Sequence, residues 1–256
     1  MRSDTSLQRR AGAQLPLCGC AQIRLRRTSH SCALGEINFK FSIMNFSQEF
    51  FSKDYFFGMK NSNYMNYNHY DNDRFWSSII LKIKKHKMGG KVLDAGCAFG
   101  FLLKRLQNDF VELHGIDISE YAVERAKKEI PSAKIQRVNM DTDSLPYPDE
   151  YFDLITALDV LEHTNSIEKN LNIISAKIKK GGYLIITVPI KDSWAGKIFR
   201  FFDKDSSHVS VLSRKEIFKM IGNSNLKILE KNYFLNSVFF KIKHIPVDVE
   251  LLLQKE

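Results

Sequence analysis

The sequence predicts an α/β fold in which a doubly wound, mostly parallel sheet lies between helices. The segment from Lys91 to Leu106 supports this class most directly, because an apolar run ends at Asp94, turns through two glycines and resumes with helical spacing. Further along, short apolar runs of strand length alternate with helical segments, as in repeated βαβ units. With 256 residues, of which 44% are hydrophobic, the chain can build one well-cored domain with appendages.

Residues 1–43 differ in composition from the rest of the chain and are expected to form a disordered leader. The first 36 residues contain six arginines, two acids and no lysine, whereas the chain beyond them is rich in lysine, asparagine and aromatic residues. Two origins stay open: an arginine-rich targeting presequence, and a start extended upstream of Met44, which the abrupt change favours. These 36 residues carry +4 of the net charge of +9, so a lysine-rich surface explains the remainder without nucleic acid.

Cysteine content and hydropathy predict a cytoplasmic protein without a membrane span. Cys18, Cys20 and Cys32 lie in the leader and Cys97 in the glycine loop. Because their spacing matches no common zinc pattern, we expect free thiols in a reducing compartment and no metal. No apolar run approaches the roughly 18 residues that cross a bilayer.

Residues 44–88 are unusually rich in aromatic side chains, and we expect them to form a helical lid. The segment ends in a helix predicted over Asp71 to Lys87, with Phe75, Ile79 and Ile83 on one face. Two interpretations stay open. The aromatic rings either pack against the edge of the core or cover a bound cofactor or substrate, where tyrosines offer area and a polar tip.

The loop from Asp94 to Gly100 has the features of a nucleotide-binding corner. Glycine allows a backbone to approach a ligand closely, and the following helix offers unpaired N–H groups. A dinucleotide fingerprint starting at Gly96 would need glycine where Ala98 and Phe101 stand, so a nicotinamide cofactor is disfavoured. The carboxylate of Asp94 suits a positively charged ligand better than a pyrophosphate, which it would repel.

A second acid follows the next predicted strand, Val111 to Ser119. Asp117 lies 21 residues beyond Gly96, close to the separation at which a βαβ unit places a carboxylate beside the ribose hydroxyls. This spacing is shared by proteins that bind NAD and S-adenosylmethionine, so it indicates a ribosylated ligand without choosing between them. Ser119 is predicted to cap the helix that follows.

The motif LDAGCAFG, Leu93 to Gly100, resembles the first motif of the class I S-adenosylmethionine-dependent methyltransferases, and it departs from the usual pattern at Ala98, where glycine is common. The resemblance implies S-adenosylmethionine as cofactor and a Rossmann-like, seven-stranded, mostly parallel sheet whose last strand is antiparallel. We place this domain at residues 89–245 and expect a C-terminal tail over residues 246–256.

A second matching block, Met140 to His163, follows the third predicted strand in the order that this family shows. By resemblance, Asp141 contacts the adenine amino group with Thr142 beside it, and Leu158 lies against the cofactor. The predicted cofactor-binding residues are Asp94, Gly96, Cys97, Ala98, Gly100, Asp117, Ile118, Asp141, Thr142 and Leu158.

The segment after the fourth predicted strand, Phe152 to Ala157, lies near the reaction centre, because ligands of parallel sheets bind beyond the carboxyl ends of the strands. Asp159 and His163 are four residues apart and could share a helix face, so that the acid orients the imidazole. His163 is the candidate general base or substrate contact. The alternative is a structural residue that holds the loop.

The rest of the chain completes the sheet. We expect a helix from Ser166 to Lys180 that stops at Gly181 and Gly182, and a strand from Tyr183 to Val188. Beyond a capped helix that starts at Ser213, the final elements are an antiparallel pair, Leu226 to Phe234 and Asn236 to Lys243. An insert from Ile190 to Leu212 is the expected place of substrate selection, and its candidates are Trp194, Arg200, Phe201, Phe202 and His208.

Together these features predict an enzyme that transfers a methyl group to a small-molecule, lipid or sugar-intermediate acceptor by in-line displacement. Two alternatives from other classes stay open. One is a non-catalytic protein that binds a cofactor or partner on the same fold, and the other, less favoured, is a nicotinamide-dependent oxidoreductase. The sequence does not indicate the acceptor or the oligomeric state.

Overall fold

The computed structural model describes residues 49–59, 62–236 and 241–256, which all belong to one unit, Ser42–Glu256. The predicted leader lies outside the described residues, so its expected disorder stays a prediction. Within the described ranges, no helix is long and apolar enough to cross a membrane.

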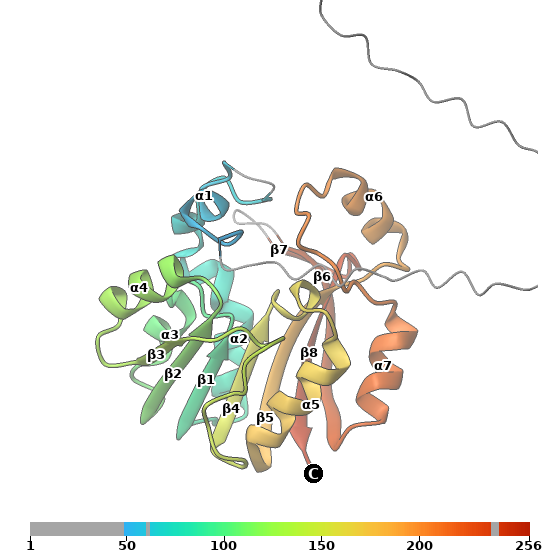
Figure 1. The fold of residues 1–256 in the computed structure, drawn as a ribbon. Helices are drawn as coiled ribbons and strands as arrows, with labels where there is room; N and C mark the ends of the chain where they lie inside the picture. The colour runs from blue at the N-terminus through green and yellow to red at the C-terminus, as the bar shows by residue number, and fades with distance from the viewer. Residues whose placement is uncertain (1–48, 60–61, 237–240) are drawn as a thin grey trace, which may run out of the picture. The chain divides into compact units, whose positions relative to one another are not determined.

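One eight-stranded sheet with the order β3-β2-β1-β4-β5-β8-β6-β7 runs through the described part of the chain (Figure 1). The first five strands pair in parallel: β1 (Lys91–Ala95), β2 (Glu112–Asp117), β3 (Lys134–Arg137), β4 (Phe152–Leu158) and β5 (Ile178–Pro189). The last three pair antiparallel: β6 (Leu226–Asn236), β7 (Lys241–Lys243) and β8 (Asp248–Lys255). The predicted fold class is confirmed, with one strand more than expected.

The expectation of a C-terminal tail is wrong, because residues 248–255 form β8 in the interior of the sheet. β8 lies between β5 and β6 and pairs antiparallel with both. Val249, Leu251, Leu252 and Leu253 are almost fully buried, so the strand is apolar on both faces. Its one charged interior residue, Glu250, binds Lys82 and Lys241, which compensates for the burial of its charge.

Helices cover both faces of the sheet and create two hydrophobic cores. On one face, α2 (Asp73–Lys85), α3 (Phe101–Leu106) and α4 (Glu120–Glu129) pack on Val92, Leu154 and Ile185. On the other face, α5 (Ile167–Lys177) and α7 (Arg214–Gly222) pack on Leu93 and Ile155. Successive residues of a strand therefore point into opposite cores, because side chains alternate between the two faces of a sheet.

The predicted N-terminal ends of two helices are confirmed by capping hydrogen bonds. Ser119 accepts a hydrogen bond from the backbone N–H of Ala122, and Ser213 forms a complete capping box with Glu216. The predicted helix stop at Gly181 is wrong, because α5 already ends at Lys177 and β5 begins at Ile178. Gly181 has φ +76° and lies inside β5, beside the register shift between β4 and β5.

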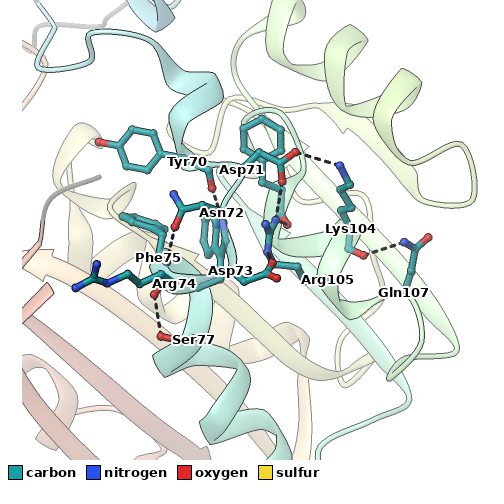
Figure 2. Close-up of polar contacts among 12 residues, drawn as sticks. Tyr70, Asp71, Asn72, Asp73, Arg74, Phe75, Ser77, Lys104, Arg105 and Gln107 are labelled. Carbon is teal, nitrogen blue, oxygen red and sulfur yellow. Dashed lines mark hydrogen bonds and ion pairs between the residues drawn. The ribbon is translucent and has the colours of Figure 1, made fainter. Parts of the chain in front are cut away.

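The aromatic segment is fixed to the core by ion pairs at the start of α2. Figure 2 shows Asp71 between Lys104 and Arg105 of α3, at 3.1 and 2.9 Å, while the Arg105 guanidinium also contacts Asp73 at 2.9 Å. The Asn72 side chain caps α2 by accepting from the N–H of Phe75. Two short helices precede α2, namely α1 (Lys53–Phe56) and η1 (Tyr67–Tyr70). These contacts hold the aromatic rings over the end of the sheet.

The predicted insert contains α6 (Trp194–Phe202) and a loop that returns to the end of β4. The 3₁₀ helix η2 (Leu161–His163) follows β4, and its Glu162 carbonyl accepts from the N–H groups of Val209 and Ser210, both at 3.0 Å. In Figure 1, α1 and α6 lie on the same side of the sheet, beyond the end where η2 follows β4.

Candidate functional site

A cavity of about 830 Å³ lies where β1, β2 and β4 end, and we call it the first cavity. Six of the ten residues predicted to bind a cofactor line it: Gly96, Ala98, Asp117, Ile118, Asp141 and Leu158. The N-terminal segment closes it from outside with Phe51, Tyr55, Phe56, Tyr64 and Tyr67.

The glycine loop has a tight geometry that depends on two of its residues being glycine. Gly96 and Gly100 both have φ +78°, in the left-handed region that side chains other than glycine disfavour. A Cβ at Gly96 would lie 2.6 Å from a methyl group of Val160, and one at Gly100 would lie 2.6 Å from Ile130. The backbone therefore approaches the cavity at Gly96, while Gly100 allows α3 to pack closely against α4.

Asp117 is positioned to accept hydrogen bonds from a ligand in the first cavity. Its Oδ2 accepts from the N–H of Ala98 at 2.8 Å, and its Oδ1 accepts from the N–H of Ser119 at 2.9 Å. Each carboxylate oxygen keeps a further lone pair. Burial raises the pKa of Asp117 to about 6, although these two backbone N–H groups favour the charged form.

Asp94 lies beneath the loop and is not among the residues that line the cavity. It is 5% exposed and accepts from Thr156 Oγ1, its register partner on β4, at 2.6 Å. Burial and the nearby Asp117 carboxylate raise the pKa of Asp94 to about 7. Two desolvated carboxylates under one loop favour a ligand with positive charge, as the sequence indicated.

The other predicted residues differ in position. Asp141 lines the first cavity and accepts from the side-chain amides of Asn165 and Asn170 at 2.9 and 3.1 Å. Cys97 is buried against Gly115, away from the cavity, and its thiol pKa is raised by burial. Thr142 is exposed, donates to Asp143 at 2.9 Å and is not among the residues that line the cavity, so its contact with the cofactor stays a prediction.

A second cavity, of about 1,020 Å³, continues from the first beyond β4, β5 and β8. The two share five lining residues, which are Tyr64, Tyr67, Leu158, Asp159 and His163. Aromatic side chains from α2 and the segment before it, including Tyr70, Phe75 and Trp76, form one wall of the second cavity. The aromatic segment therefore contributes to the core and also covers both cavities.

Carboxylates are the main charged groups of the second cavity: Asp159, Glu162, Asp205, Asp248 and Glu250. Burial and the charge of Asp159 raise the pKa of Glu162 well above its ordinary value, and the same two causes raise the pKa of Asp248 to about 8. Only Glu250 pairs directly with a lysine of this cavity, Lys241, at 2.8 Å, within the part of the chain that the structure describes. The cavity thus holds more buried carboxyl groups than Lys241 and His208 can compensate, and the neutral forms of Glu162 and Asp248 are favoured.

His163 lines both cavities, as the topology predicted, but its partner differs from the expected one. Its Nδ1 lies 2.7 Å from Ser207 Oγ, while Asp159 accepts from Thr187 Oγ1 at 2.6 Å. Asp159 and His163 do not share an α-helical face, because Asp159 has φ +50° and His163 ends a 3₁₀ turn. Burial and the neighbouring His208 lower the pKa of His163 to about 4.

One insert candidate reaches the second cavity. His208 lines it, and its Nδ1 lies 2.6 Å from Asp203 Oδ2. That carboxylate and Glu162 raise the pKa of His208 to about 9 against the effect of burial. Trp194 and Phe201 are 67% and 84% exposed and are not among the cavity residues, while the side chains of Arg200 and Phe202 lie outside what the structure describes.

Sequence reasoning missed the charged residues that β7, β8 and the insert add to this site. Asp205 accepts from the hydroxyl of Tyr55 at 2.6 Å and from Ser207, and so connects the aromatic segment to His163. Lys241, Asp248 and Glu250 reach the second cavity only because β8 lies beside β5. No local pattern in the sequence marks such a contact.

Comparison with known proteins agrees with this geometry. The methyltransferase domain family matches residues 67–231, which include the glycine loop, the three acids that line the first cavity and the insert. The chain belongs to this family. Membership confirms the predicted class I methyltransferase and, with it, S-adenosylmethionine as the methyl donor.

Relatives and solved structures show how far the similarity extends. An uncharacterized protein of Methanocaldococcus jannaschii is 33% identical over 164 residues, which are 63% of this chain and 67% of that protein. A ubiquinone biosynthesis O-methyltransferase of Coxiella burnetii is 32% identical over 104 residues, which are 39% of this chain and 43% of that enzyme. The YcgJ protein of Bacillus subtilis has the same fold, with a TM-score of 0.58 and 18% sequence identity. The similarity covers 70% of this chain and 98% of the YcgJ chain.

Proposed function

We propose that this methyltransferase binds S-adenosylmethionine in the first cavity and a small acceptor molecule in the second. The observation that carries the proposal is that two cavities meet at the carboxyl ends of β4 and β5 and share five lining residues. A methyl group on a ligand in one cavity can therefore face a nucleophile in the other.

The residues of the first cavity fit the cofactor in charge and in hydrogen-bonding capacity. Asp117 is placed to accept from a ribose hydroxyl, and Asp141 offers a carboxylate to an exocyclic amine. Leu158, at the end of β4, lines both cavities and so lies between the two ligands. Because burial raises the pKa values of Asp94 and Asp117, a cation would stabilise both carboxylates, and the methyl donor carries two positive groups.

S-adenosylmethionine supplies a methyl group on a sulfonium sulfur, which is displaced in line by the acceptor. The protein contributes by aligning the two ligands and by excluding water. Tyr64 and Tyr67 lie at the junction of the cavities, and burial raises the pKa of both phenols well above the ordinary value, so both stay neutral. They provide area and dipoles around the reacting atoms without adding charge.

The second cavity favours an acceptor that is compact, partly aromatic or amphiphilic, and not strongly anionic. Its wall of tyrosine, phenylalanine and tryptophan rings offers stacking area, whereas its surplus of carboxylates repels phosphate groups. A small molecule, or the uncharged end of a lipid or sugar intermediate, agrees with both features.

Calorimetric titration of the full chain with S-adenosylmethionine and S-adenosylhomocysteine tests the cofactor site. We expect both to bind and Asp117→Asn to weaken both, by roughly 10- to 100-fold, because a charge-assisted hydrogen bond is worth about 1.5–3 kcal/mol. Glu112→Gln, an acid on the same strand that pairs with Lys134 and Lys91, is the matched control. Equal affinity of the two variants would overturn the assignment of the first cavity.

A further inference from the structure

Three side chains that line the second cavity lie close together. Glu162 and His163 belong to the turn after β4, and His208 belongs to the insert. One potential ligand atom from each lies within 4.8 Å of the other two. The two backbone hydrogen bonds from Val209 and Ser210 to the Glu162 carbonyl hold the insert against the turn, so the three residues stay together.

Hydrogen bonds fix the imidazoles so that the same nitrogen of each ring remains available. Ser207 Oγ donates its proton to Asp205, so it accepts from His163, whose Nδ1 must carry a proton. The Asp203 carboxylate can only accept, so His208 also donates through Nδ1. The lone pair of each neutral ring is therefore at Nε2. Metal-binding histidines show this arrangement, in which the second nitrogen donates to a carboxylate or another acceptor.

Glu162 supplies a carboxylate oxygen that has no partner within the described part of the chain. The residue is 2% exposed, and its Oε2 makes no hydrogen bond there. A buried carboxylate oxygen without a partner is costly, and three further acids of the cavity, Asp159, Asp205 and Asp248, add to the negative field. A cation bound at Glu162 would compensate for both.

We propose that Glu162, His163 and His208 bind a divalent transition-metal ion in the second cavity. One carboxylate and two imidazoles are a set that suits zinc and similar ions and leaves at least one coordination position open. Neighbouring ligands of such an ion lie about 3.3 Å apart, so small side-chain rotations close the site. Binding displaces any proton on His208, since imidazole ligates in its neutral form.

The ion deepens the proposed function, on which this role rests, because its three ligands line the cavity proposed for the acceptor. A hydroxyl group bound there loses its proton to water more readily, since the ion lowers the pKa of the hydroxyl. The oxygen then forms a bond to the methyl carbon while the bond from that carbon to sulfur breaks and S-adenosylhomocysteine leaves. We therefore infer an acceptor that is methylated on oxygen and expect His163 to act as a ligand rather than as a base.

Titration of the chelator-treated full chain with Co²⁺, followed by visible absorption and calorimetry, tests the site directly. Co²⁺ prefers the same nitrogen and oxygen ligands as zinc and has a visible spectrum that reports its coordination. The leader thiols at Cys18, Cys20 and Cys32 are replaced by serine, because thiolates also bind such ions. We expect one ion per chain, bound roughly 10- to 100-fold more weakly after Glu162→Gln or His208→Gln.

Two matched variants outside both cavities serve as controls. His86→Gln and Glu112→Gln remove the same kinds of group from other ion pairs, with Glu230 and with Lys134, and are expected to leave Co²⁺ affinity within about twofold of the parent. Asp203→Asn, which changes the hydrogen-bond partner of His208 without removing a ligand, is expected to weaken Co²⁺ binding about tenfold. This last variant keeps the test available should the direct ligand variants fold poorly.

Affinity for S-adenosylhomocysteine, measured on every variant, separates the two proposals. The metal site alone would be overturned if the chain binds S-adenosylhomocysteine but no Co²⁺. The same conclusion would follow if it binds S-adenosylhomocysteine and Glu162→Gln and His208→Gln leave its Co²⁺ affinity unchanged. Co²⁺ binding that depends on both residues in a chain that does not bind S-adenosylhomocysteine would support the metal site and refute the proposed function.

Discussion

Replacing Asp94 by asparagine should stabilise the fold and weaken the binding of the methyl donor, because both effects depend on the same buried charge. The side chain is 5% exposed and its pKa is raised to about 7 by burial and by Asp117. The asparagine side chain carries no charge, yet its amide oxygen can still accept from Thr156 Oγ1, which lies 2.6 Å from Asp94 Oδ1.

The magnitude follows from the difference between the folded and unfolded pKa values. The folded protein binds more protons than the unfolded chain between the two values, so this group lowers the stability as the pH rises through that window. A rise from an ordinary value of about 3.8 to about 7 corresponds to about 4 kcal/mol at pH 7.5 and about 1 kcal/mol at pH 4.5. The asparagine NH₂ group without a partner costs about 1–2 kcal/mol at either pH. The stability of the variant relative to the parent should therefore increase by about 3 kcal/mol from pH 4.5 to pH 7.5.

Urea unfolding of the parent and of Asp94→Asn at pH 4.5 and 7.5 measures this difference. The donor affinity is measured on the same samples at pH 7.5. A charge pair about 10 Å apart at an effective dielectric constant of about 20 is worth about 1.7 kcal/mol, so we expect binding roughly tenfold weaker. A stability difference that is the same at both pH values would refute the reasoning, since it would show that Asp94 does not bear a destabilising charge.

Three further outcomes are expected. Gly100→Ala should lower the free energy of unfolding, measured with urea, by about 1–3 kcal/mol, because φ of Gly100 is +78° and a Cβ there would lie 2.6 Å from a side chain. Gly222→Ala, where a Cβ would meet no atom, should not lower it. Lys82→Met should lower the free energy of unfolding by about 1–3 kcal/mol, because Glu250 then keeps Lys241 as its remaining lysine partner; no loss of stability would contradict the pairing. Calorimetry should show donor affinity rising from pH 5 to 7 as Asp117 loses its proton, and tighter binding at pH 5 would exclude this role.

Local sequence determined the glycine loop of the first cavity and the acid that follows the second strand. The turn at Gly96 and Gly100 needs positive φ, and the acid at Asp117 follows a strand at a spacing that βαβ geometry fixes. These features lie within about thirty residues of each other, so backbone preferences and strand length suffice to predict them. The hydroxyl of Thr142 donates to the neighbouring Asp143, a choice between two adjacent acceptors that spacing does not reveal.

Only the tertiary structure decided the second cavity. The sequence placed His163 near the reaction centre, but its partners, Ser207 and His208, come from an insert more than forty residues away. Glu250 and Lys241 enter the site because β8 lies between β5 and β6, where residues expected to form a tail are buried on both faces. Periodicity reports which side chains are buried, whereas the pairing of distant strands and the packing of a loop decide which charges meet. The sequence therefore determines the fold and the glycine loop of the first cavity, and tertiary contacts determine which side chains meet in the second cavity.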